Sequence, residues 1–117
     1  MSHITVTPSD KEVEVSFAGE VIASSTRALE LKEGDYPAVY YLPPEDVKGQ
    51  YLSKTEHQTH CPWKGDAAYW SVEANGEKAE NVVWAYPEPK EGVEEIEGYM
   101  AFYPSKLEVK VDGETLS

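Results

Sequence analysis

Several features that would identify a functional class are scarce in this sequence. Its one cysteine, Cys61, excludes an internal disulfide bond. The longest apolar runs, such as 38–42 and 82–86, span five residues, whereas a membrane-spanning helix needs about 20. Ten Lys and Arg residues accompany 22 Asp and Glu residues, giving a formal net charge of −12. Nucleic acids and anionic membranes bind cationic surfaces, so we expect neither as a partner.

Familiar catalytic and targeting motifs are also missing. The sequence has no Gly-rich phosphate loop, no G-x-S-x-G and no H-E-x-x-H. The first residues, Met1–Thr5, have neither the basic nor the apolar region of a secretory signal peptide. We therefore expect a cytoplasmic protein without a cofactor, present as a monomer or a homodimer.

The dominant pattern in the chain is a period of two. Apolar and polar residues alternate in 13–17 and in 107–111, which predicts half-buried strands. Asn75-Gly76 is a strong hairpin signal between two further strands. The other expected strands are 20–25, 26–32, 38–42, 65–73, 78–86 and 99–103. The segment 51–58 gives a mixed signal.

These patterns predict one mainly β domain over residues 1–117. We expect eight or nine short antiparallel strands in a compact fold, with at most two short helical turns. One turn follows Pro44, and the other includes Val93 and Ile96 and ends at Gly98.

The segment Thr59–Gly65 is the most unusual part of the chain. Its proline and glycine predict a turn that presents Cys61 and Lys64 together at a strand end. A nearby cation, Lys64 or protonated His60, lowers the pKa of a thiol and favours the reactive thiolate. The alternative is a buried, inert cysteine. His57, His60 and Cys61 do not have the paired spacing of a zinc site, so we predict no metal.

Aromatic residues and the single arginine are a second source of candidates. Of 13 Tyr, Trp and Phe residues, 11 are Tyr or Trp and carry a polar group. Many fall on the expected strands, where alternation sends some of them away from the core and toward a pocket or the surface. Arg27 suits the capture of a carboxylate or phosphate, and an ordinary surface ion pair is the alternative.

Five segments together resemble a known family, the domain of unknown function numbered 427. They read YYLP at 40–43, DV at 46–47, THCPWKGDAAYW at 59–70, WAYP at 84–87 and IEGYMAFY at 96–103. The resemblance covers about residues 13–113 and implies a fold of the β-tent kind. Relatives with that architecture include zinc-carrying domains and B-type methionine sulfoxide reductases, whose Cys-x-x-Cys zinc motifs this chain does not have.

By position, the resemblance also implies a cleft that contains both groups of candidates. Its members are Arg27, Tyr41, Cys61, Lys64, Tyr69, Trp84, Tyr86 and Tyr103.

Three functions from different classes follow from these candidates. In the first, aromatic side chains bind a small apolar or planar molecule, and Lys64 and Arg27 orient an anionic group on it. In the second, the protein is a thiol-dependent enzyme with Cys61 as nucleophile or redox centre and Lys64 or His60 as the activating cation. In the third, the aromatic surface is a protein-interaction module.

Overall fold

The computed structural model describes residues 3–116, whose strands form three antiparallel sheets. The first has the order β1-β4-β5 and contains β1 (Ile4–Pro8), β4 (Leu29–Glu33) and β5 (Val39–Tyr41). The second has the order β11-β10-β2-β3 and contains β2 (Val13–Phe17), β3 (Glu20–Ser25), β10 (Glu108–Val111) and β11 (Glu114–Thr115). The third has the order β6-β7-β8-β9 and contains β6 (Leu52–Cys61), β7 (Gly65–Ala74), β8 (Glu77–Ala85) and β9 (Met100–Phe102).

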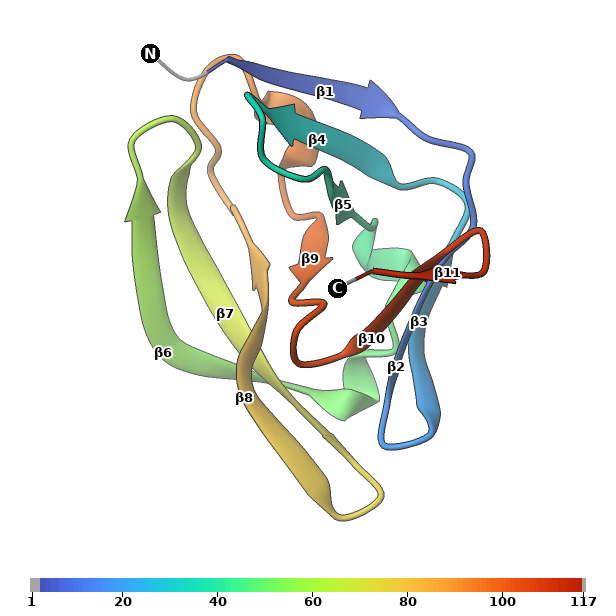
Figure 1. Cartoon of the computed structure of the whole chain (residues 1–117). Helices are drawn as coiled ribbons and strands as arrows, with labels where there is room; N and C mark the ends of the chain where they lie inside the picture. Colours follow the sequence, from blue (N-terminus) through green and yellow to red (C-terminus); the bar gives the residue numbers. More distant parts are fainter. Residues whose placement is uncertain (1–2, 117) are drawn as a thin grey trace.

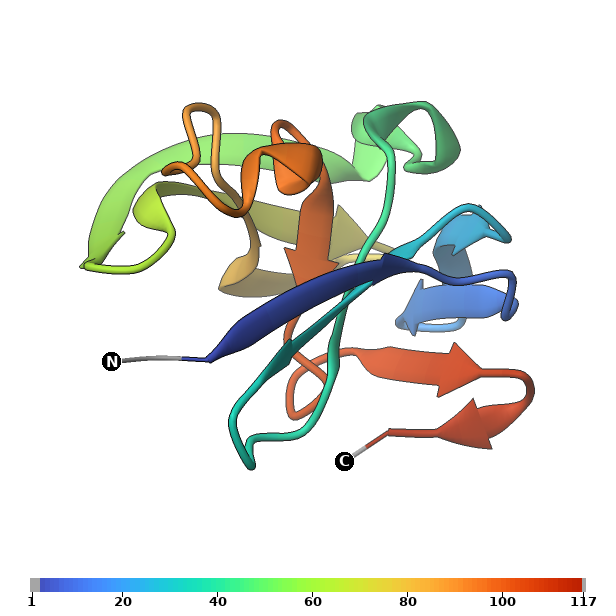
Figure 2. The ribbon, with the colours of Figure 1, turned by 90° about the horizontal axis from the view of Figure 1, so that it is seen from above.

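The first and second sheets both pack against the third. In Figure 1 the long strands β6, β7 and β8 lie on one side, and β2, β3 and β10 lie on the other. Seen from above, β1 and β4 cross in front of β9, and the β10–β11 hairpin lies on the side away from β6 (Figure 2). A bridge between Leu42 and Met100 joins the end of β5 to β9, and a bridge between Ala23 and Val47 joins β3 to the loop after β5.

Two clusters of buried side chains form the core. The first lies between the second and third sheets and is mainly aliphatic, with Val13, Val15, Leu42, Val72, Val83, Phe102 and Val109 among its members. The second lies between the first and third sheets and contains Leu31, Tyr41, Ala67, Tyr69, Tyr86, Val93, Ile96 and Ala101. Strand β7 contributes to both clusters, because successive side chains of a strand point to opposite faces.

The expected mainly β fold is confirmed, with differences in detail. Strands 13–17 and 20–25, the hairpin at Asn75-Gly76 and the turns η1 (Pro44–Asp46) and η3 (Glu94–Ile96) lie where the sequence predicts them. Residues 3–116 contain eleven strands rather than eight or nine, and a third 3-10 turn, η2 (Gly49–Tyr51), exceeds the expected two. Residue 51 of the mixed segment 51–58 ends η2, and residues 52–58 belong to β6, a largely exposed edge strand that shows no apolar alternation because it has little to bury.

Two expectations concern the ends of the chain. Residues 1–2, part of the segment expected not to be a signal peptide, and residue 117 of the expected 1–117 domain lie outside the described residues. Within residues 3–116, the structure has no helix with the length and apolar character needed to cross a bilayer.

Candidate functional site

The turn from Cys61 to Gly65 has a backbone geometry that only glycine suits. The Lys64 N–H donates a hydrogen bond to the Cys61 carbonyl oxygen at 3.2 Å, and the Lys64 carbonyl accepts one from the Lys90 N–H at 2.9 Å. Gly65 has a φ of +116°, and a Cβ at this position would lie 3.1 Å from the Glu88 carbonyl oxygen. A side chain would meet both backbone strain and a close approach, so Gly65 fixes the path of the turn.

This turn directs the Lys64 side chain toward the first sheet. Its Nζ lies 2.9 Å from Oε1 of Glu33, the last residue of β4. The two side chains are only 12 % and 21 % exposed. The pair is therefore largely withdrawn from solvent, where a charge needs a partner.

Lys64 and Glu33 line a cavity of about 210 Å³, which we call the tyrosine cavity. The remaining lining residues are Leu31, Tyr36, Pro37, Val39, Tyr41, Tyr69, Trp84, Tyr86 and Tyr103. The structure thus brings Lys64 together with all five aromatic residues that the family resemblance implies for a cleft.

Direct contacts order the aromatic side chains. The Trp84 Nε1–H donates a hydrogen bond to the Tyr41 hydroxyl at 3.2 Å, and the two rings meet edge to face. The ring of Trp84 also lies against Tyr103, with centroids 4.5 Å apart. The Tyr69 hydroxyl lies 2.9 Å from the Thr59 hydroxyl. These contacts hold the polar groups of the cavity in defined directions.

Three phenols of this cavity, those of Tyr41, Tyr86 and Tyr103, are held in their neutral form. Burial raises the pKa of Tyr41 to about 12. Burial and the hydrogen bond with Tyr69 raise the pKa of Tyr103 to about 12. Burial also raises the pKa of Tyr86. These three phenols therefore stay protonated at neutral pH and above.

Cys61 lies beside the tyrosine cavity and does not line it. It is half-buried at the end of β6 and packs against the second core cluster. The turn joins the backbones of Cys61 and Lys64 by a hydrogen bond, but the Lys64 ammonium group is directed to Glu33.

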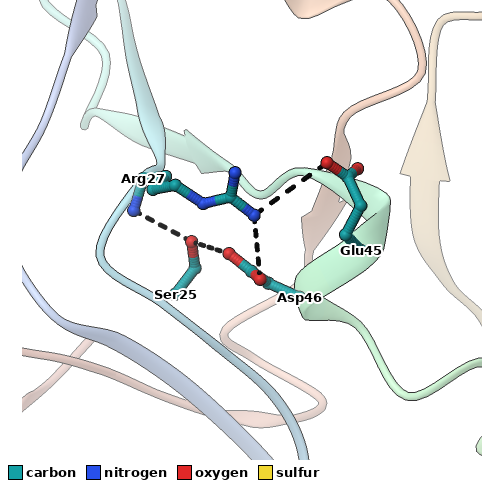
Figure 3. Close-up of polar contacts among 4 residues, drawn as sticks. All are labelled: Ser25, Arg27, Glu45 and Asp46. Carbon is teal, nitrogen blue, oxygen red and sulfur yellow. Dashed lines mark hydrogen bonds and ion pairs between the residues drawn. The ribbon is translucent and has the colours of Figure 1, made fainter.

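Arg27 lies away from this cavity, in a surface cluster between β3 and η1 (Figure 3). Its guanidinium lies 3.1 Å from an Asp46 carboxylate oxygen and 3.9 Å from Glu45, and its side chain is 60 % exposed. The Ser25 hydroxyl donates to Asp46 at 2.6 Å and accepts from the Arg27 backbone N–H. The hydrogen bonds from Ser25 and Arg27 lower the pKa of Asp46. Arg27 is therefore engaged by neighbouring carboxylates.

A larger cavity of about 460 Å³, which we call the apolar cavity, adjoins the tyrosine cavity. Both are lined by Glu33, Tyr36, Pro37, Val39, Trp84 and Tyr103. The apolar cavity is further lined by Val13, Val15, Ala38, Tyr40, Leu42, Phe102, Pro104, Val109 and Leu116. Sequence reasoning missed this cavity and Glu33, because each depends on contacts between sheets.

The two histidines considered as metal ligands make separate contacts. His57 packs edge to face on Tyr69, with ring centroids 4.6 Å apart. His60 Nδ1 lies 2.7 Å from the Asp66 carboxylate on the exposed surface. Among residues 3–116, no group of three or more His, Cys, Asp or Glu side chains is arranged to hold a metal ion.

Comparison with known proteins supports the family resemblance that the five sequence segments indicate. The model of a family described as "Domain of unknown function (DUF427)" matches residues 5–114. This chain belongs to the DUF427 family. No match is found among curated proteins. The matched segment includes Lys64, Glu33 and the five aromatic residues, so the tyrosine cavity lies within the DUF427 domain.

Proposed function

We propose that this DUF427 protein binds a small, uncharged, largely aromatic ligand in the tyrosine cavity. The observation that carries the proposal is the convergence of Lys64 and five aromatic side chains on one cavity. They come from β5, the turn after β6, β7, the β8 end and the residue after β9. Ligand sites combine apolar and aromatic walls with a few polar groups in the same way.

The pairing of charges favours an uncharged ligand over an anionic one. Lys64 and Glu33 contribute opposite charges within 2.9 Å of each other, and Arg27 is paired with Asp46 elsewhere. No unpaired cation among these candidates is left to attract an anion, and the chain carries a net charge of −12. The neutral Tyr41 hydroxyl, which accepts from Trp84 and keeps its own proton, suits a ligand group that accepts hydrogen bonds.

The same ion pair argues against the thiol-enzyme hypothesis. A thiolate at Cys61 needs a nearby cation to stabilise it, and the Lys64 ammonium group is already bound to Glu33. Thiol chemistry at Cys61 and a protein-interaction role both stay predictions from the sequence.

Titration calorimetry with 2-naphthol and 2-naphthoate tests the proposal, because the two probes share a ring system and differ in charge. We expect 2-naphthol to bind and 2-naphthoate to bind more weakly. Trp84→Phe removes the indole that contacts Tyr41 and Tyr103 and should weaken 2-naphthol binding about threefold to tenfold.

Trp63→Phe is the matched control, since Trp63 is 44 % exposed and lines neither cavity. This variant should bind 2-naphthol like the unmodified protein. Absence of binding, or equal weakening in both folded variants, would contradict the proposal. Tighter binding of 2-naphthoate would contradict the inference that the ligand is uncharged.

A further inference from the structure

We infer that the ligand of this protein is amphipathic, with a polar head group in the tyrosine cavity and an apolar tail in the apolar cavity. The inference rests on the proposed function and extends it, because it concerns the part of the ligand that lies outside the tyrosine cavity. Three features of the two cavities support it.

The first feature is size. The tyrosine cavity, at about 210 Å³, is smaller than the roughly 300 Å³ at which ligand pockets usually begin. The apolar cavity, at about 460 Å³, lies within the usual range. A ligand of the size that such pockets usually hold therefore extends beyond the tyrosine cavity, and the adjoining apolar cavity offers the room for it.

The second feature is continuity. Six residues line both cavities, and they include the contacting rings of Trp84 and Tyr103. Tyr36 and Pro37, in the loop between β4 and β5, also border both. Tyr36 is 72 % exposed, which places the junction of the two cavities on an accessible side of the molecule. One ligand can therefore extend from one cavity into the other past the Trp84 ring.

The third feature is the separation of polar and apolar groups. Lys64 and the hydroxyls of Tyr41, Tyr69 and Tyr86 line the tyrosine cavity alone. The described residues that line the apolar cavity alone carry no charge, and its inner part is formed by Val13, Val15 and Val109. Glu33 lies at the junction and is paired with Lys64. A polar group in the apolar part would lose its hydration without replacement, whereas a hydrocarbon chain gains from burial there.

A homologous series of probes measures the tail directly. Phenol, 4-ethylphenol, 4-butylphenol and 4-hexylphenol carry one head group and tails of increasing length. We expect the dissociation constant from titration calorimetry to fall about fourfold for each added methylene. The gain should stop once the tail fills the apolar cavity.

Two substitutions fill the apolar cavity and leave the tyrosine cavity unchanged. Ala38 and Leu116 line the apolar cavity alone. Ala38→Trp and, at a second wall, Leu116→Trp should abolish the dependence on tail length while phenol binds as before. Asp35→Trp is the control, because it adds an indole to the same exposed loop without lining either cavity. Thermal unfolding identifies which variants are folded.

The outcomes separate the inference from the proposed function. If phenol and 2-naphthol bind but affinity does not change with tail length, the inference of an amphipathic ligand is wrong and the proposed function stands. If tail dependence persists in folded Ala38→Trp and Leu116→Trp, the tail lies elsewhere and the inference is equally overturned. If neither phenol nor 2-naphthol binds, the proposed function itself fails.

Discussion

The surroundings of Lys64 and Arg27 differ although both cations pair with a carboxylate at a similar distance. The Lys64–Glu33 contact is 2.9 Å and the Arg27–Asp46 contact is 3.1 Å. The Lys64 side chain is 12 % exposed and lines the tyrosine cavity, whereas the Arg27 side chain is 60 % exposed. Because the chain has few cationic residues, the sequence makes both of them candidate ligand-binding residues. Only their surroundings in the structure distinguish the two.

What positions each cation explains the difference. Lys64 is held by the backbone of a turn, through hydrogen bonds to Cys61 and Lys90 and through the glycine that follows it. Arg27 is held at its backbone N–H by the Ser25 hydroxyl and at its guanidinium by Asp46 (Figure 3). The backbone turn fixes where the Lys64 side chain starts and burial orders its rotamers, whereas the Arg27 guanidinium stays largely in solvent and is ordered there by its ion pair.

The largest effect is expected from Gly65→Ala, which breaks the turn that positions Lys64. The substitution should lower the free energy of unfolding by about 3 kcal/mol, because alanine meets both the positive φ and the Glu88 carbonyl. Gly19→Ala shares the positive φ but has open space around a Cβ, and it should cost about 1 kcal/mol. If urea unfolding shows equal losses of unfolding free energy for Gly65→Ala and Gly19→Ala, the close approach of the Glu88 carbonyl at Gly65 is unimportant.

Lys64→Met tests whether the enclosed ion pair depends on both partners. It leaves the Glu33 carboxylate without its ammonium partner in a place that is 21 % exposed, and it should cost about 2 kcal/mol at pH 7. The double variant Glu33→Gln/Lys64→Met should recover part of that loss in the same unfolding measurement. A double variant no more stable than the single one would contradict the pairing argument.

Local patterns in the sequence predict much of the sheet structure. Alternation in Val13–Phe17 and the Asn75-Gly76 turn need only neighbouring residues to define them, and both are found. The turn between Cys61 and Gly65 is also local. The family resemblance implies a cleft for the aromatic candidates, and the five of them line one cavity.

Long-range contacts explain what the sequence could not predict. Glu33 is 31 residues from Lys64 and has no feature that separates it from the other acidic residues. The apolar cavity requires the meeting of Val15 from β2, Val39 from β5 and Phe102 from β9. In its own strand, each of these three residues has the pattern of an ordinary core residue. Only the packing of the three sheets reveals the space between them.

The stability of the protein at alkaline pH tests how far the tyrosines around Lys64 are shielded from solvent. The pKa of Tyr41 is about 12 in the folded protein, above the value of about 10 in an unfolded chain. Folding therefore favours the protonated phenol. The stability from this group is present below pH 10 and is lost as the pH rises to 12, by about 1 kcal/mol per pH unit.

Tyr41→Phe should reduce that alkaline loss, and Tyr103→Phe should do the same, since its pKa is raised to about 12 as well. Thermal unfolding measured from pH 9 to pH 11.5 checks both variants. If the melting temperature falls with rising pH as steeply in the variants as in the unmodified protein, these phenols ionise as readily in the folded protein as in the unfolded chain.

The smallest effect is expected at Arg27. The lowered pKa of Asp46 means that its stabilising contribution is present above the unfolded value, near pH 4, and is lost as the pH falls through the folded pKa. Arg27→Met should therefore lower the melting temperature slightly at pH 7, and the difference from the unmodified protein should shrink at pH 2.5. Lys48→Met, which removes the same charge from an exposed position, is the control. Binding of 2-naphthol should be unchanged, because Arg27 lines neither cavity; a weakened affinity would place Arg27 in the ligand site and end its contrast with Lys64.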